Sequence, residues 1–437
     1  MDRAVWRESA LGGMLFMAAQ LGVVLPVFAQ QEPLPSPLTL EQALAIADEA
    51  HPTRQMADAS LARAEALSRQ AAAADDVQLG FTASLRAVDP SKNAIYQTHN
   101  DSLARLNLSK QLYDFGRTAR AEEAAAATLS SREWQLLEVK LQRRLDVMQR
   151  FFAVLLADLE YARDNEALST AYISFDRARN KQELGKTSDI EVLELESLYQ
   201  QSRRQMIVSR NKQRITRSQL AISLNRPTDL PRYLTMPDWE VESPGEDLDV
   251  WVERILQENP RIRSLRAEVE AAVKQLQASE AADNPVLRGE LEAATYEREL
   301  GGRDPFTAAL VFEMPLYSGQ RVDAKAAEQR ALVQQKGAEL AAYELELRQQ
   351  VLDIWMEFDR LKLQEEALQV TSDYRDLYLD RSRTLYELDM QTDLGDSMSK
   401  IADIQWQKAQ NKFDSLLLMA RLKALAGENL KEGAAPE

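Results

Sequence analysis

The sequence of 437 residues contains no cysteine. This excludes disulfide bonds, thiolate metal sites and cysteine nucleophiles, and it also excludes a lipid anchor attached through a cysteine at the start of the mature chain. Histidine is nearly absent, because His51 and His99 are the only two. Two histidines are too few for a histidine-based metal site unless carboxylates supply the other ligands. Glycine and proline are also scarce, with 15 of each.

The chain also lacks an excess of basic residues. It has 53 Lys and Arg against 69 Asp and Glu, for a formal net charge of -16. Binding to phosphate backbones needs a basic face, so we predict no nucleic-acid partner. The sequence contains no nucleophile elbow, phosphate loop or histidine pair with ligand spacing. We therefore predict no catalytic residues, no cofactor and no bound metal, and we expect that the protein is not an enzyme.

Long apolar runs are missing except at the N-terminus. Arg3 and Arg7 precede an apolar run over residues 11–28, which ends in Val27-Phe28-Ala29. This pattern predicts a secretory signal peptide over residues 1–29. A retained transmembrane anchor is the alternative, but Gln20 inside the run favours cleavage. No later run approaches 18 apolar residues, so we expect that any mature segment inside a membrane is a strand rather than a helix.

The sequence does contain an internal repeat. Residues 112–117 (LYDFGR) match residues 316–321 (LYSGQR) at an offset of 204, and residues 183–190 (ELGKTSDI) match residues 387–394 (ELDMQTDL) at the same offset. A proline-rich linker over residues 227–246 excludes a continuous helix between the two copies. The predicted division is a first repeat at 30–226, a second repeat at 247–430 and a disordered tail at 431–437.

Each repeat predicts the same order of elements, which is a helix pair, two strands, a long helix and a returning helix. His51-Pro52 and Asn259-Pro260 are predicted breaks within the helix pairs. The long stretch at 117–184 contains neither glycine nor proline, and a helix of that length is about 100 Å long. Apolar residues three and four apart in it are typical of coiled coils. The predicted elements are strands 77–88, 102–112, 286–296 and 306–316, long helices 117–184 and 321–388, and returning helices 188–225 and 393–426.

The predicted strands alternate between apolar and polar residues. Their length suits tilted transmembrane strands, and their polar face carries charged residues such as Arg105, Arg288 and Glu290. A soluble sandwich is the alternative, in which a second sheet covers the apolar face. Four strands cannot close a barrel, and open edges are not tolerated in lipid. Three copies supply twelve strands, whereas two supply eight and leave an interior filled by side chains. We therefore predict a homotrimer in contact with outer-membrane lipid.

The order, spacing and duplication of these segments resemble the TolC-like outer-membrane efflux protein family over about residues 38–430. The segments that end at Arg117 and at Arg321 look like the strand-to-helix junctions of that family, with Gly116 and Gly319 as the junction glycines. The stretch around Gly185 looks like its periplasmic tip turn. The expected fold is mainly α with a small β part: long antiparallel coiled-coil helices in a trimeric α-barrel, joined to a 12-stranded outer-membrane β-barrel with four strands per subunit.

The resemblance implies an exit duct of a tripartite efflux or type I secretion system. Its implied partners are a periplasmic adaptor protein and an inner-membrane pump, and its implied location is the bacterial outer membrane, extending into the periplasm. The alternative is a periplasmic coiled-coil scaffold that conducts nothing. The sequence does not distinguish drugs, metal ions and polypeptides as cargo.

The resemblance also implies a constriction at the periplasmic tip. The first copy supplies Gly185, Glu191 and Glu194, whereas the second copy departs from the family pattern because Asp389 replaces the tip-turn glycine. Acids elsewhere at the two turns are Asp189, Asp393 and Asp396. Threefold symmetry would turn each inward-facing acid into a ring that selects cations. The alternative for each is a solvated helix-start residue favoured by the helix dipole.

Overall fold

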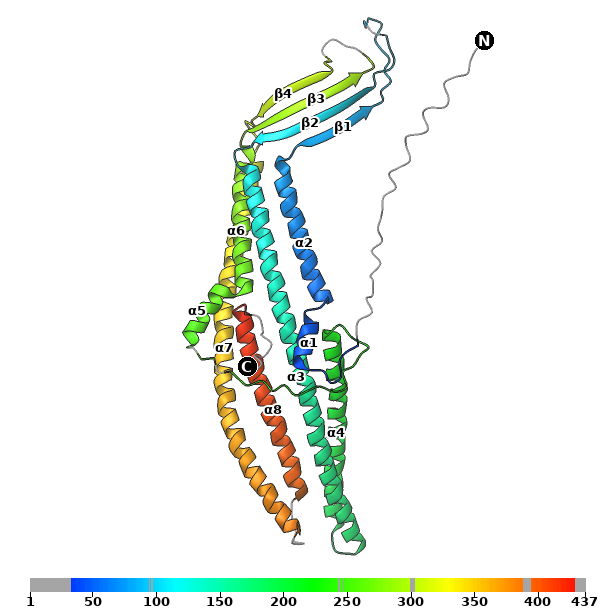
Figure 1. Ribbon diagram of the computed structural model, residues 1–437, viewed down its shortest axis with the longest axis vertical. Coiled ribbons are helices and arrows are strands. Elements are labelled where there is room, and N and C mark those ends of the chain that lie inside the picture. The colour runs from blue at the N-terminus through cyan, green and yellow to red at the C-terminus, as the bar shows by residue number, and fades with distance from the viewer. Residues whose placement is uncertain are drawn as a thin grey trace, which may run out of the picture.

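The computed structural model describes residues 33–93, 95, 97–242, 244, 245, 247–298, 303–387 and 394–428, without the side chains of Tyr386, Leu394 and Asp396. The predicted signal peptide, the predicted tail, Asp389 and Asp393 lie outside these residues. The molecule is a long rod of helices with a small sheet at one end (Figure 1).

The same order of elements occurs in both halves of the chain. The first half contains α1 (Leu40–Ala47), α2 (Pro52–Ala72), a short 3-10 helix η1 (Ala73–Asp75), β1 (Gln78–Ser84), β2 (Leu103–Tyr113), α3 (Arg117–Glu183) and α4 (Asp189–Ser223). The second contains α5 (Leu248–Glu258), α6 (Pro260–Glu280), η2 (Ala281–Asp283), β3 (Val286–Tyr296), β4 (Phe306–Glu313), α7 (Arg321–Glu387) and α8 (Leu394–Leu425). The helix bounds lie within two residues of the predicted ones, which is the ordinary uncertainty of helix ends.

The helices form a single layer around α3, which has 67 residues. In the half of the rod next to the sheet, α3 packs between α2 and α6, and α7 packs on the other side of α6. In the other half, α3 packs between α4 and α8, and α7 packs on the other side of α8. The layer therefore runs α2-α3-α6-α7 near the sheet and α4-α3-α8-α7 away from it. Its outer members are α2 and α4 on one side and α7 on the other (Figure 1).

The two predicted proline breaks are helix starts in the structure. Pro52 and Pro260 each occupy the first position of a helix, where the missing N–H of proline is not needed. His51 Nδ1 accepts a hydrogen bond from the Thr53 N–H at 3.2 Å. Asn259 Oδ1 accepts one from the Ile262 N–H at 3.0 Å. Burial and the nearby charge of Arg143 lower the pKa of His51, which favours the neutral imidazole that can accept this bond.

Two apolar clusters hold the layer together at mid-length, where α1 and α5 lie against it. In the first cluster, the rings of Phe152 (α3) and Phe413 (α8) stack with centroids 4.4 Å apart, beside Leu44 from α1 and Leu220 from α4. The second cluster joins α5, α7 and the end of α8 and includes Trp251, Ile255, Leu347, Val351 and Leu422. Burial of each large apolar side chain stabilises the fold by about 1.5–3 kcal/mol, so these clusters fix the middle of the rod.

The sheet is antiparallel, with the strand order β1-β2-β3-β4. The β2–β3 pairing joins the two halves of the chain, and Leu106 lies opposite Ala293 in it. Two strands are shorter than predicted. β1 ends at Ser84 rather than at 88, because the next residues form a loop in which Ala87 bridges Asn100. β4 ends at Glu313 rather than at 316, two residues before Pro315, which has no N–H to donate to a ladder.

None of the helices in the described ranges is both long and apolar enough to cross a membrane. The predicted mainly helical fold with a small antiparallel sheet is confirmed.

Candidate functional site

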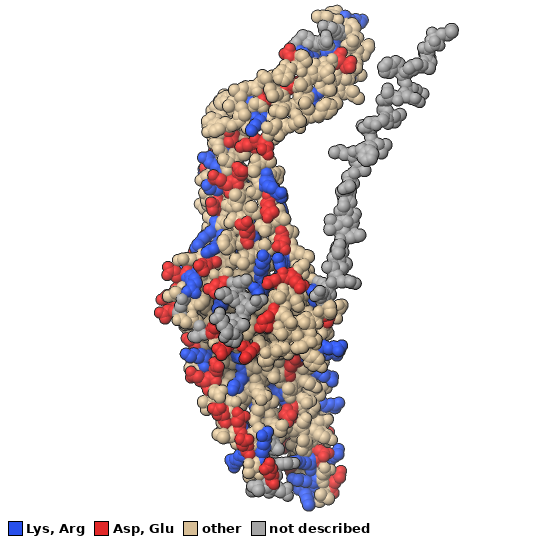
Figure 2. Space-filling model, viewed as in Figure 1, with Lys and Arg blue, Asp and Glu red and all other residues tan. Residues whose placement is uncertain are grey.

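One face of the sheet is apolar across all four strands and is not covered by another part of the described chain. Phe81 is 72% exposed and Leu310 is 68% exposed. The strand registers align the apolar residues in two cross-strand rows, which are Phe81, Leu106, Ala293 and Phe306, and Leu79, Leu108, Leu291 and Ala308. The sheet face turned toward the viewer in Figure 2 is almost free of charge, in contrast to the helices below it. A contiguous exposed apolar face of this kind indicates a partner or a membrane. The described residues form no second sheet that would make it the core of a sandwich.

The opposite face of the sheet carries charges of both signs. Arg105 Nε lies 3.2 Å from Glu292 Oε1, and Arg288 Nη1 lies 3.8 Å from Glu290 Oε1. These residues and the apolar rows point to opposite sides, because successive side chains of a strand alternate. The sheet therefore separates an apolar surface from a charged, hydrated one.

The outer edges of the sheet have no strand partner within the described chain. β1 pairs with β2 alone, and β4 pairs with β3 alone. Each edge consequently presents a row of unpaired backbone N–H and C=O groups, which are a template for pairing with another chain.

At the first strand-to-helix junction, Asp114 organises the start of α3. Its carboxylate accepts hydrogen bonds from the Gly116 N–H at 3.1 Å, the Thr118 N–H at 2.7 Å and the Thr118 hydroxyl at 2.6 Å. Gly116 has φ of 85°, a left-handed conformation that glycine adopts without steric cost. Burial alone would raise the pKa of Asp114, but these hydrogen bonds and the charge of Arg117 outweigh it and lower the pKa. The carboxylate is therefore ionised at neutral pH.

The second junction also contains a glycine with positive φ, but it has fewer hydrogen bonds. Gly319 has φ of 70°, and Ser318 occupies the place of Asp114 in the sequence repeat. Its hydroxyl donates to Asp283 Oδ2 at 3.1 Å. The two junction glycines thus adopt the conformation that a tight strand-to-helix turn requires.

The predicted tip turn of the first half is a compact helix end. Gly185, with φ of 68°, donates its N–H to Gln182 O at 2.8 Å. The Lys186 N–H reaches Lys181 O at 2.9 Å. Together these two bonds form a Schellman motif, which ends α3. The chain then reverses into α4 through Ser188, whose hydroxyl accepts from the Glu191 N–H at 3.3 Å.

The acids of the first tip differ in their surroundings, although all are exposed. Asp189 accepts a hydrogen bond from Gln182 Nε2 at 2.7 Å, and Glu191 accepts one from the Thr187 hydroxyl. Glu194 has no hydrogen-bond or ion-pair partner among the described residues. Asp189 and Glu191 are thus engaged at the start of α4, whereas Glu194 is available for another role.

The structure describes less of the second tip. Asp389 and Asp393 lie outside the described residues, and Asp396 is placed only as a backbone position in α8. The neighbouring Gly395 lies close to α3, because a Cβ added there would stand 3.0 Å from Thr170. Thr170 also donates its hydroxyl to Gly395 O at 3.1 Å. This close approach gives a physical reason for glycine at position 395.

The sequence analysis did not predict two exposed apolar surfaces of the helix layer. The outer side of α7 exposes Met356, Leu363, Val370 and Leu377, which we call the α7 stripe. The outer side of α4 exposes Val208, Ile215 and Ile222, which we call the α4 stripe. Both sets recur every seven residues, the spacing of a coiled-coil seam. This spacing was visible in the sequence, but the packing had to show which apolar positions lack a partner within the chain.

Among the described residues, no cluster of three or more His, Asp or Glu side chains has the geometry of a metal site.

Comparisons with known proteins agree with the geometry. Residues 251–428, from α5 to the end of α8, match the sequence profile of the outer membrane efflux protein family. No curated protein matches the sequence. The fold is similar to that of CusC, with a TM-score of 0.74 and 17% identity over 92% of this chain and 96% of that one. It is also similar to VceC of Vibrio cholerae, with a TM-score of 0.72 and 17% identity over 90% of this chain and 97% of that one.

The CmeC outer membrane channel of Campylobacter jejuni has a TM-score of 0.74 at 12% identity, over 90% of this chain and 87% of that one. At these identities the solved structures show a shared fold, and the sequence profile shows the family signature. Together they confirm the resemblance to the TolC-like outer-membrane efflux proteins.

The junctions generate a paired prediction. Asp114→Ala removes the acceptor of four hydrogen bonds, the fourth being from Gln111 Nε2 at 3.2 Å, and should destabilise the start of α3 by about 1–2 kcal/mol. Ser318→Ala removes one hydrogen bond at the equivalent place and should have a smaller effect. Thermal unfolding of the two variants in detergent, followed by circular dichroism, compares them. Equal shifts of the unfolding temperature would show that Asp114 has no special role.

Proposed function

We propose that this chain, an outer-membrane efflux protein of the TolC-like kind, is one of three identical subunits of an exit duct. The duct would accept cargo from a periplasmic adaptor and an inner-membrane pump and release it outside the cell. Drugs, metal ions and polypeptides are all compatible with such a duct. The observation that carries the proposal is the sheet, with one face apolar and exposed, the other charged, and both edges unpaired.

Closure of the sheet explains the number of subunits. The free edges of β1 and β4 can pair with those of neighbouring copies, and hydrocarbon cannot supply the missing hydrogen bonds. Three copies give twelve strands, enough to enclose a lumen rather than a core filled with side chains. In this barrel the apolar rows face lipid and the charged face lines the lumen.

The helix layer supports the same closure. Its outer members are α7 on one side and α4 on the other, and each presents an apolar stripe whose residues recur every seven positions. A head-to-tail contact between α7 of one copy and α4 of the next closes into a ring. Burial of both stripes would remove from water the apolar side chains that a single copy exposes.

The register of that contact follows from the packing within the chain. α3 and α4 run antiparallel, with Glu160 2.6 Å from Lys212 and Asp158 2.8 Å from Arg217. α7 begins 204 residues after α3, at Arg321 instead of Arg117. If both halves follow one duplicated plan, Leu363 stands at the height of residue 159 of α3 and hence opposite Ile215 of α4. Met356 then meets Ile222 and Val370 meets Val208, so the two stripes coincide along their lengths.

Absence of cysteine allows a direct test of this ring. The double variant Ile215→Cys with Leu363→Cys should be crosslinked between subunits by a short bismaleimide, because the two positions face each other only across the proposed contact. Denaturing gels should then show covalent dimers and trimers and no larger species. Each single cysteine variant is the control and should yield much less of these products. A ladder that extends beyond three, or none at all, would contradict the proposed ring.

The assignment of the lipid-facing side predicts an asymmetric effect of lysine substitutions on β4. Leu310→Lys with Phe312→Lys places two charges on the apolar face, at about 2–4 kcal/mol each near mid-bilayer. The matched control, Thr307→Lys with Ala309→Lys, adds the same charge to the other face, opposite Glu292 and Glu290. Mass photometry of outer-membrane extracts should show trimers of the control and few or none of the first variant. Normal trimers of the first variant would mean that the faces are assigned the wrong way round.

We further propose that acids at the periplasmic tip form the narrowest, cation-selective part of the duct. Asp393 and Asp396 are the first candidates because a spacing of three in the sequence would place them on one face of a helix. Glu194 is the next, because Asp189 and Glu191 are engaged at the start of α4.

The duct should show a small cation-selective conductance in planar bilayers, blocked by polyvalent cations. Asp393→Asn with Asp396→Asn should weaken both properties. Asp189→Asn with Glu191→Gln removes the same charge at the first tip and should change them less. Should the first pair leave selectivity and block unchanged, these two acids do not line the constriction.

A further inference from the structure

A cavity of about 370 Å³ lies at mid-length in the helix layer. Its walls come from α3, the start of α6, α7 and the end of α8. It lies where α8 ends against the start of α6, a junction fixed by the hydrogen bond from Asn259 Nδ2 to Leu425 O at 2.9 Å. A volume of this size is typical of small-molecule sites.

The walls combine an apolar surface with unpaired charges. Leu141, Leu145 and Ile354 supply apolar area. Glu138, Asp353, Arg261 and Arg421 also line the cavity, and none of the four forms an ion pair with a described residue. Glu138 and Asp353 accept hydrogen bonds from neutral amides only, from Gln142 Nε2 at 3.1 Å and from Gln349 Nε2 at 2.7 Å. Both carboxylates therefore keep their charge uncompensated by a close cation.

Two carboxylates and two guanidinium groups line the cavity, and further carboxylates act on its lining residues from outside. Glu339 and Glu357 also lie nearby, but their charges are compensated because they form ion pairs with Lys336 and Arg360. Glu138 and Asp353 in the lining are balanced by Arg261 and Arg421. Outside the lining, Glu346 acts on Tyr343, and Asp414 interacts with Arg421. With these two, the cavity and its immediate surroundings have two more carboxylates without an ion pair than guanidinium groups. Burial raises the pKa of Glu138, against the opposing effect of Arg261. Burial and the charge of Glu138 also raise the pKa of Tyr343 to about 12. A cation placed here would relieve both effects.

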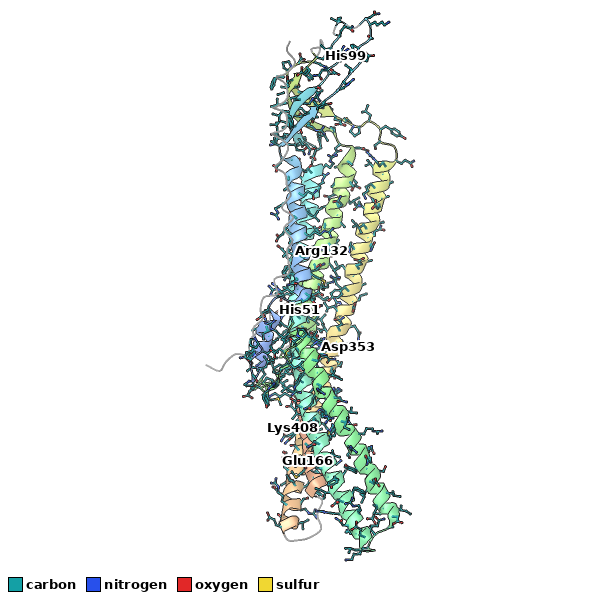
Figure 3. All side chains as sticks on the ribbon, turned by 90° about the vertical axis from the view of Figure 1, so that its right-hand side faces the viewer. His51, His99, Arg132, Glu166, Asp353 and Lys408 are labelled. Atoms are coloured by element: carbon teal, nitrogen blue, oxygen red, sulfur yellow. The ribbon has the colours of Figure 1, made fainter. Side chains whose placement is uncertain are left out.

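Asp353, one of the residues that line the cavity, lies on the side of the layer away from α1. Figure 3 shows the segments around α1 on one side of the long helices and Asp353 on the other. In the proposed trimer, the side away from α1 is continuous with the charged face of the sheet and hence with the lumen. Three copies would then place three such cavities at one height in the duct wall.

We propose that this cavity is a binding site for amphipathic organic cations, with an apolar body against Leu141, Leu145 and Ile354 and a positive group between Glu138 and Asp353. The phenol ring of Tyr343 offers a second, cation–π contact to the positive group. Binding of the cation to this cavity does not depend on whether the protein forms a duct. A role of the cavity in holding cargo on its way through the duct rests on the proposed function.

The test uses the detergent-solubilised full-length protein and two probes of similar size and opposite charge, benzyltrimethylammonium and benzylsulfonate. Saturation-transfer difference NMR measures their binding. The wild type should bind the cation and not the anion. Glu138→Gln with Asp353→Asn should weaken cation binding about tenfold or more, which corresponds to about 1.4 kcal/mol. Glu133→Gln, an equal loss of charge on an exposed position of α3 outside the cavity, should leave it unchanged.

Equal binding of both probes, or cation binding that survives the double substitution, overturns the proposal. So does equal weakening by Glu133→Gln, because it would show general charge attraction instead of a site. Conductance of the same wild-type preparation separates the two proposals. A protein that conducts but does not bind the cation lacks the site, whereas one that binds but does not conduct has the site and is not a duct.

Discussion

The packing of α3 against its four helical neighbours positions every other part of the molecule. α3 is one continuous helix, whereas the elements beside it are arranged in series, with α2 and α6 next to the sheet and α4 and α8 at the other end. Phe151 and Phe152 are both fully buried and lie in the part of α3 where its neighbours change from α2 and α6 to α4 and α8. Because a single helix crosses the change, the sheet and the tip are held in fixed relation over about 100 Å.

The same arrangement leaves the layer incomplete at its two sides. α3 has neighbours on both sides in both halves of the rod, but α7 has them on only one. Leu363 and Val370 are exposed for this reason, since nothing else in the described chain reaches them. The free edges of β1 and β4 lie at the same two sides, and what they lack is hydrogen-bond partners rather than cover for apolar side chains. Sheet and helices thus leave unpartnered surfaces at the same two sides of the chain, and the proposed head-to-tail contact would cover both.

The sequence allowed prediction of those elements whose causes are local. The long helices were predictable because no proline or glycine interrupts residues 117–184, and the helix starts at Pro52 and Pro260 because proline fixes them. The end of β1 could not be predicted from the sequence, because it depends on the bridge between Ala87 and Asn100, which is a contact across a loop. The roles of Asp189 and Glu191 could not be separated from that of Glu194 either, since the difference lies in the side chains of Gln182 and Thr187. Glu138 and Arg261 are 123 residues apart, and only packing brings them to one cavity.

The position of the cavity has a physical reason in the same architecture. Each half of the chain stacks two helices end to end. α4 ends at Ser223 next to the start of α2, and Asn225 just after it has φ of 57°. α8 ends at Leu425 next to the start of α6, and Gly427 just after it has φ of 73°. Helix ends cannot interlock as helix sides do, so each junction tends to leave a gap. The α4–α2 junction lies at the side of the layer, where Arg226 and Glu49 pair across it at 2.9 Å. The α8–α6 junction lies between two continuous helices, α3 and α7, and only a sharp kink, for which neither helix has a proline, would bring their backbones into the gap. A hollow bounded by two long, continuous helices is therefore retained at that point, and the side chains that α3 and α7 place there decide what it can bind.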